Sequence, residues 1–132
     1  MTPLTALITV LALLMYFVVT INVGRARAKY GVPVPKTTGN EDFERALRVQ
    51  QNTLEQLVFF LPLFWIFSYF VSDTIGAIFG GIWVIGRILY AWGYYQEADK
   101  RAPGFAISSL SGMILMLWGL VKLTLLVMAQ YQ

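Results

Sequence analysis

The chain has 132 residues and a net charge of +3; 58% of its residues are hydrophobic, 13% are charged, and its mean hydropathy is +0.64. So few polar residues cannot cover a water-soluble core, and the apolar residues come in long runs. Cysteine and histidine are absent. Their absence excludes disulfides, thiolate metal sites, cysteine nucleophiles and histidine general bases. The composition predicts an integral membrane protein, for which we expect no metal site.

The first apolar run covers residues 4–23 and contains no charged residue. At about 1.5 Å per residue, a helix of this length crosses about 30 Å of hydrocarbon. A cleavable signal peptide, cut near residues 26–28, is the alternative interpretation. We favour a membrane span over residues 4–24, because no Lys or Arg precedes the run and because the run is too long for a signal h-region.

Residues 25–42 are predicted to form a polar loop, because no apolar periodicity is visible between Tyr30 and Asp42 and the segment contains two prolines and a Thr-Thr-Gly-Asn turn. The positive-inside rule places this loop on the cytoplasmic side. Its basic residues are Arg25, Arg27, Lys29 and Lys36.

The second span is expected over residues 43–71, with Asp42 as its N-terminal cap and Pro62 as the site of a kink. A two-residue turn makes the third span, residues 74–99, its antiparallel neighbour. After an Ala-Pro-Gly break, the fourth span is expected over residues 104–129.

These spans predict an all-α fold: a single membrane domain over residues 1–132, built as an integral membrane four-helix bundle with antiparallel up-down topology. Nine of the ten basic residues, all except Lys122, are expected on the same side of the membrane as the first loop or in parts of the spans that face that side. This bias also places the loop between the third and fourth spans on the cytoplasmic side, with both termini opposite.

Two polar columns enter the membrane. In the second span, polar residues spaced 3, 4 and 3 apart share one helix face: Arg45, Arg48, Asn52 and Glu55. In the third span, polar residues are spaced 3, 4, 3 and 4 apart, and they share a face if the helix continues through Lys100: Arg87, Tyr90, Tyr94, Glu97 and Arg101. A polar column within lipid must face protein, water or a ligand, and the first column suits a small zwitterionic polyanion.

Glu55 and Arg87 connect the two columns. Each lies about 12 residues from the cytoplasmic end of its span, which places both about 18 Å deep. An unpaired charge near the bilayer midplane costs at least ~2.5–3.5 kcal/mol on insertion scales. We therefore predict a structural Glu55–Arg87 salt bridge at the floor of a polar cavity.

Residues 39–55, G-N-E-D-F-E-R-A-L-R-V-Q-Q-N-T-L-E, resemble the hallmark of the MAPEG family, the membrane-associated proteins in eicosanoid and glutathione metabolism. Residues 87–105, R-I-L-Y-A-W-G-Y-Y-Q-E-A-D-K-R-A-P-G-F, are similar to the branch of that family containing microsomal glutathione transferases and leukotriene C4 synthase. The resemblance implies a homotrimer that binds glutathione, as a co-substrate, between neighbouring subunits near the cytoplasmic face.

The resemblance also implies roles for individual residues. Arg101 falls on the arginine that the family uses to stabilise the glutathione thiolate. The implied glutathione-binding residues are Arg27, Arg48, Gln50, Asn52, Glu55, Tyr90 and Tyr94. Glutathione carries two carboxylates, one ammonium and one thiol, so its site needs cationic groups, an acidic partner and a group that favours the thiolate.

The function implied is that of a membrane-bound glutathione transferase or peroxidase acting on a lipophilic electrophile. Ala28 replaces the second arginine of a pair found in leukotriene C4 synthase, which disfavours a dedicated synthase. Two alternatives are a non-catalytic lipid-binding adaptor of the same family and a small four-helix exporter. The exporter is disfavoured because the first span lacks the carboxylate that proton coupling often uses. We expect membrane lipid as a partner and no nucleic acid.

Overall fold

The computed structural model describes residues 1–132. It consists of four long helices and one short 3₁₀ helix, and it contains no strand. The elements are α1 (Pro3–Tyr30), α2 (Glu41–Phe70), α3 (Asp73–Gln96), the 3₁₀ helix η1 (Ala98–Arg101) and α4 (Ala102–Gln130). All four α-helices are long and apolar enough to cross a membrane, which confirms the prediction of an all-α protein with four spans.

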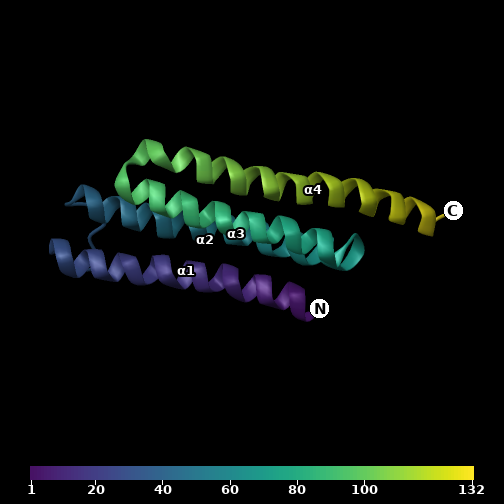
Figure 1. Cartoon of the computed structure of the whole chain (residues 1–132), viewed down its shortest axis with the longest axis horizontal. Helices are drawn as coiled ribbons and strands as arrows, with labels where there is room; N and C mark the ends of the chain where they lie inside the picture. Colours follow the sequence, from purple (N-terminus) through teal and green to yellow (C-terminus); the bar gives the residue numbers. More distant parts are fainter.

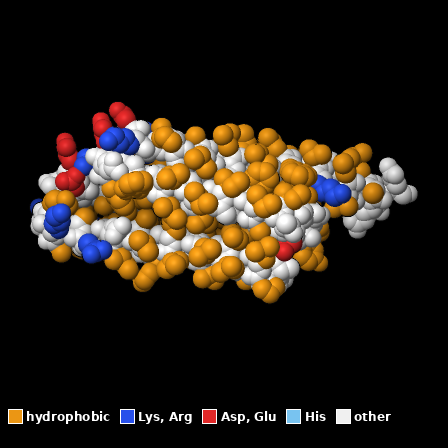
Figure 2. Space-filling model, viewed as in Figure 1, with side chains coloured by type: hydrophobic (Ala, Val, Ile, Leu, Met, Phe, Trp, Pro, Cys, Tyr) orange, Lys and Arg blue, Asp and Glu red, His pale blue; other side chains and the backbone are white.

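The four helices lie roughly along one axis (Figure 1). Both chain termini lie at one end of the bundle, and the α1–α2 loop and the α3–α4 turn lie at the other. Helices α2 and α3 form the central pair, because each contacts the other and both contact α1 and α4. Most of the charged side chains visible in Figure 2 gather at the end with the α1–α2 loop, whereas hydrophobic side chains cover the middle.

Aromatic packing holds α2 against α3. The rings of Phe60 and Trp83 stack with centroids 4.0 Å apart, and Phe64 stacks on Phe60 at 5.3 Å. All three side chains are almost completely buried. Between membrane-spanning helices such packing acts through close van der Waals contact and ring stacking, with a stacked aromatic pair contributing about 0.5–1.5 kcal/mol, so this stack helps to hold the central pair together.

Two helix ends differ from the predicted bounds. Helix α1 continues to Tyr30 and ends at Gly31, which adopts the left-handed conformation (φ 66°). Residues 25–30 are thus helical, not part of the loop, because alanine, arginine and lysine are strong helix formers even where they are too polar for lipid. The cap of α2 is Asn40, which accepts a hydrogen bond from the Phe43 amide at 3.0 Å. Asp42, the predicted cap, instead pairs with Arg45 inside the helix.

The third span also ends earlier than predicted. Helix α3 stops at Gln96, because Glu97 is extended (φ −162°, ψ 139°), and the chain then forms η1. The assumption that one helix continues through Lys100 is therefore wrong. Helix α4 begins at Ala102, directly after η1, with Pro103 in its first turn. Proline suits this position, because the first amides of a helix have no partner within it.

Candidate functional site

A polar cavity of about 490 Å³ lies between α2, α3, η1 and the start of α4. It lies at the end of the bundle that carries the α3–α4 turn. Five of the eight residues predicted to form the site line it together. Its lining consists of Arg48, Asn52, Tyr90, Tyr94, Asp99, Arg101, Ala102 and Phe105.

Aromatic rings form one wall of this cavity. Tyr90 is buried, and its ring meets that of Tyr94 edge to face with centroids 5.6 Å apart. Phe105 of α4 lies against Tyr90 at 6.2 Å. The wall therefore presents two phenolic groups next to apolar surface, a combination that can hold a ligand with polar and apolar parts.

Arg101 covers this wall from η1. Its guanidinium carbon lies 5.6 Å from the centroid of the Tyr94 ring, within the range of a cation–π contact. Nη1 donates a hydrogen bond to the carbonyl oxygen of Ala98 at 2.6 Å. A guanidinium has five N–H donors, so Arg101 keeps donors for an anion in the cavity.

Two glycines allow the chain to place Arg101 there although α3 has ended. A Cβ atom on Gly93 would overlap the backbone of Lys100, and one on Gly104 would overlap the backbone of Tyr90. The backbones of α3, η1 and α4 are thus in direct contact, an approach that only glycine permits. The sequence predicted that Arg101 would lie near Tyr94 because the two residues are seven apart on one helix. In the structure they are close because the tight turn after α3 brings Arg101 back over Tyr94.

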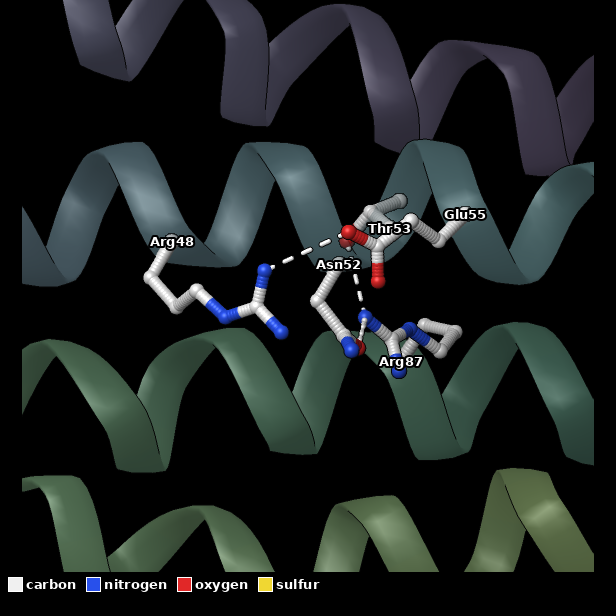
Figure 3. A network of polar contacts seen from close by, with 5 residues as sticks. All are labelled: Arg48, Asn52, Thr53, Glu55 and Arg87. Carbon is white, nitrogen blue, oxygen red and sulfur yellow. Dashed lines mark hydrogen bonds and ion pairs between the residues drawn. The ribbon is translucent and has the colours of Figure 1, made fainter.

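A buried polar network lies next to the cavity (Figure 3). Arg87 has no exposed surface; its Nη2 donates to Asn52 Oδ1 at 2.8 Å and to Thr53 Oγ1 at 3.0 Å. Its guanidinium carbon lies 4.0 Å from the centroid of the Tyr90 ring. Nε and Nη1 of Arg87 have no hydrogen-bond partner within the chain. Arg87 thus holds two lining residues, Asn52 and Tyr90, in position.

The predicted Glu55–Arg87 salt bridge is wrong. Glu55 instead pairs with Arg48, two turns away on the same face of α2, with 3.3 Å between Oε1 and Nη1 (Figure 3). Arg87 instead donates from Nη2 to the neutral oxygens of Asn52 and Thr53, which are buried between the two helices. Equal depth in the membrane did not decide the partner of Glu55: the Glu55 side chain is exposed and does not line the cavity, whereas Arg87 is completely buried.

Arg27 and Gln50 lie away from the cavity, at the contact between α1 and α2. Arg27 donates to the carbonyl of Lys36 at 2.7 Å, and its guanidinium carbon lies 4.7 Å from the centroid of the Phe43 ring. Gln50 donates to the hydroxyl of Tyr16 on α1 at 3.0 Å. Within one chain, neither residue reaches the others of the predicted site.

Three lining residues, Asp99, Ala102 and Phe105, were not predicted. All three lie within the motif over residues 87–105, but they fall outside the 3-and-4 spacing that identified the polar columns. Only the end of α3 at Gln96 and the tight turn after it bring them to the cavity. Asp99 supplies the only carboxylate in the lining of the cavity.

The fold and the site define a four-helix membrane protein with an arginine- and tyrosine-lined cavity at one end of its central helix pair. The model of the MAPEG family matches residues 5–121, and the chain belongs to this family. This confirms the resemblance of its two motifs.

Curated relatives cover most of the chain. An uncharacterized protein of Synechocystis sp. is 64% identical over 89% of this chain and 86% of its own length. Human microsomal glutathione S-transferase 2 is 35% identical over 80% of this chain and 71% of its own length. Leukotriene C4 synthase of Cavia porcellus is 33% identical over 86% of this chain and 77% of its own length.

Proposed function

We propose that this protein is a glutathione-dependent membrane enzyme that transfers glutathione to a lipophilic electrophile, or reduces a lipophilic peroxide with it. The observation that carries this proposal is the single cavity that gathers Arg48, Asn52, Tyr90, Tyr94 and Arg101. Membership of the MAPEG family and the similarity to a microsomal glutathione S-transferase support glutathione as the co-substrate.

The polar groups of the cavity complement those of glutathione. Arg48 and Arg101 supply two guanidinium groups for its two carboxylates and its thiolate, and such groups bind carboxylates through paired hydrogen bonds. Two carboxylates are candidates for its ammonium group: Asp99, which lines the cavity, and Glu55, which pairs with the lining residue Arg48. Asn52, whose Oδ1 is held by Arg87, keeps its amide N–H groups for a peptide carbonyl.

Arg101 is the proposed catalytic residue. A free thiol has a pKa near ~8.5, and a guanidinium within hydrogen-bond reach in a site of low dielectric constant lowers it by about a unit or more. In transfer, the thiolate sulfur bonds to the electrophilic carbon, and the displaced group leaves with the electron pair. In peroxide reduction, two glutathione molecules are oxidised to the disulfide while the peroxide yields an alcohol and water.

A homotrimer is part of the proposal. In a symmetric ring, the α1–α2 face of one subunit would contact the cavity side of the next. That contact would bring Arg27 and Gln50, which lie on the α1–α2 face, to the glutathione bound by a neighbouring subunit. The loop after α1 and the α3–α4 turn would then face the cytoplasm, where glutathione is available.

The test is a glutathione titration of the purified protein in detergent, with the bound thiolate measured by its ultraviolet absorbance. We expect wild type to bind glutathione and to show thiolate at a pH at least about one unit below the pKa of the free thiol. Arg101→Ala should still bind glutathione, because Arg48 and Asn52 remain, but it should show no thiolate absorbance.

Lys100→Ala is the matched control, because Lys100 is an adjacent basic residue that does not line the cavity. Equal thiolate signals in wild type and Arg101→Ala would exclude Arg101 from the mechanism. Failure of wild type to bind glutathione would refute the proposed function and favour the non-catalytic adaptor.

A further inference from the structure

A second, apolar groove lies on the opposite side of α3, between α3 and α1. Its volume is about 540 Å³, and ten of its eleven lining residues are hydrophobic. Met15, Val19 and Val84 form its buried floor, whereas Val18 and Trp92 stand exposed at its sides. Tyr94 lines the polar cavity and the next residue, Tyr95, lines the groove, so α3 separates the two sites.

The groove ends in a polar mouth at the charged end of the bundle. Asn22 donates a hydrogen bond to the hydroxyl of Tyr95 at 3.1 Å, and both residues also line a smaller hollow of about 280 Å³. That hollow carries Arg25 and Lys29, one helical turn apart on α1. Groove and hollow therefore share two residues and form one continuous surface.

The two cations of the mouth have no anionic partner within the chain. The only ion pairs within 4.0 Å are Arg45–Asp42 and Arg48–Glu55, so neither Arg25 nor Lys29 is paired. Asp42, the one carboxylate in the hollow, is held by Arg45. Both cations are exposed, and Lys29 lies 5.3 Å from the ring centroid of Tyr30.

The length of the groove matches one leaflet of a bilayer. Its lining on α1 runs from Leu11 to Asn22, which at about 1.5 Å per residue spans about 16 Å. Half of a hydrocarbon core of about 30 Å is about 15 Å. Arg25 and Lys29 follow one and two turns further along the same helix face, at the level of the headgroups.

We propose that the α1–α3 groove binds one anionic phospholipid of the surrounding membrane, with an acyl chain in the groove and the phosphate between Arg25 and Lys29. The positive charge of the mouth favours an anionic lipid, because two unpaired cations lie beside a groove as long as one leaflet. A guanidinium group can also donate two parallel hydrogen bonds to the oxygens of one phosphate. The site is independent of the proposed enzymatic reaction, because it lies across α3 from the polar cavity.

The first test is native mass spectrometry of the purified protein, in detergent, titrated with phosphatidylglycerol or phosphatidylcholine. Wild type should retain phosphatidylglycerol at concentrations about tenfold or more below those needed for phosphatidylcholine. Arg25→Gln/Lys29→Gln should lose this preference. Lys36→Gln/Lys100→Gln, which removes the same charge at the same end of the bundle but outside the hollow, should keep it.

A second pair of variants tests the groove itself. Val18 and Leu13 are similarly exposed on α1, at 47% and 46%, but only Val18 lines the groove. Val18→Trp should fill it and remove one bound phosphatidylglycerol per chain, and Leu13→Trp should not.

Four results would overturn the proposal: no preference for phosphatidylglycerol in wild type, equal loss in both charge variants, unchanged binding by Val18→Trp, or equally tight binding of oleate with the same dependence on Arg25 and Lys29. The last result would identify a fatty-acid site instead.

Discussion

The guanidinium of Arg87 is completely buried between α2 and α3, yet no carboxylate contacts it. Two neutral oxygens, from Asn52 and Thr53, accept hydrogen bonds from one of its nitrogens, and the ring of Tyr90 faces it. A buried charge costs several kcal/mol unless such partners compensate it. The stability of the central helix pair should therefore depend on these few contacts.

Thr53→Val tests this dependence. Valine has nearly the shape of threonine but cannot accept the hydrogen bond from Arg87, so the variant should lose about 1–3 kcal/mol of stability. Thermal unfolding in detergent would show this as a lower melting temperature. Thr53→Ser keeps the hydroxyl and should lose less. A stable Thr53→Val together with a destabilised Thr53→Ser would mean that the methyl group of Thr53 matters and its hydrogen bond with Arg87 does not.

The ion pair between Arg48 and Glu55 should contribute much less to the free energy of unfolding. Both side chains are about half exposed, at 48% and 57%, and exposed pairs contribute about 0–1 kcal/mol. Glu55→Gln should therefore leave the melting temperature almost unchanged.

If Glu55 accepts the ammonium of glutathione, as proposed, the same variant should weaken glutathione binding several-fold in a calorimetric titration. Glu44→Gln, which changes an exposed acidic residue of the same helix outside the polar cavity, is the control. Unchanged affinity in Glu55→Gln would assign Glu55 to the pair with Arg48 alone.

At the scale of elements, hydropathy predicted which segments are helices but not where they end. The four spans follow from long apolar runs, because only a helix satisfies its own backbone in lipid. Helix ends depend on single residues and backbone angles, such as the left-handed Gly31 after α1 and the extended Glu97 after α3. The lengths predicted from the sequence were therefore too short for α1, whose last turns are polar, and too long for α3.

The α3–α4 turn carries a prediction of its own. Gly104→Ala should force α4 away from α3, because the added Cβ would overlap the backbone of Tyr90. Since η1 lies in the same turn, Arg101 should move with it, and the thiolate absorbance of bound glutathione should fall along with the melting temperature.

Gly81→Ala provides the comparison, because no atom lies within 4 Å of a Cβ at that position of α3. That variant should be neutral or more stable by about 0.5–1 kcal/mol, since alanine is the better helix former. A Gly104→Ala protein as stable and as active as Gly81→Ala would show that the close contact is unimportant.

At the scale of the whole molecule, the 3-and-4 spacing of polar residues predicted most of the cavity that a single chain forms. Arg48, Asn52, Tyr90 and Tyr94 line one cavity because residues 3 or 4 apart share a helix face and because α2 packs on α3. Asp99 and Phe105 were missed, since a turn and not a periodic helix brings them in. The partner of Arg87 was also missed, because depth alone does not determine which face a residue occupies.

Of the three predicted residues that do not line the cavity, Arg27 and Gln50 can join the site only from another subunit, and this requirement can be tested directly. In the proposed homotrimer, Arg27→Gln and Arg101→Ala should each abolish activity. Co-expressed in equal amounts, they should recover activity in about a quarter of the sites, because in a cyclic trimer a site is intact when an Arg27→Gln subunit supplies Arg101 and its neighbour supplies Arg27.

The control is co-expression of Arg48→Ala with Arg101→Ala. Both residues line the same cavity of one chain, so every site in any mixed trimer lacks one of them, and activity should not recover. Transferase assays on tagged, purified hetero-oligomers would measure both combinations. If the first combination stays inactive, Arg27 acts within its own chain, where it holds the carbonyl of Lys36, and glutathione is bound by a single subunit.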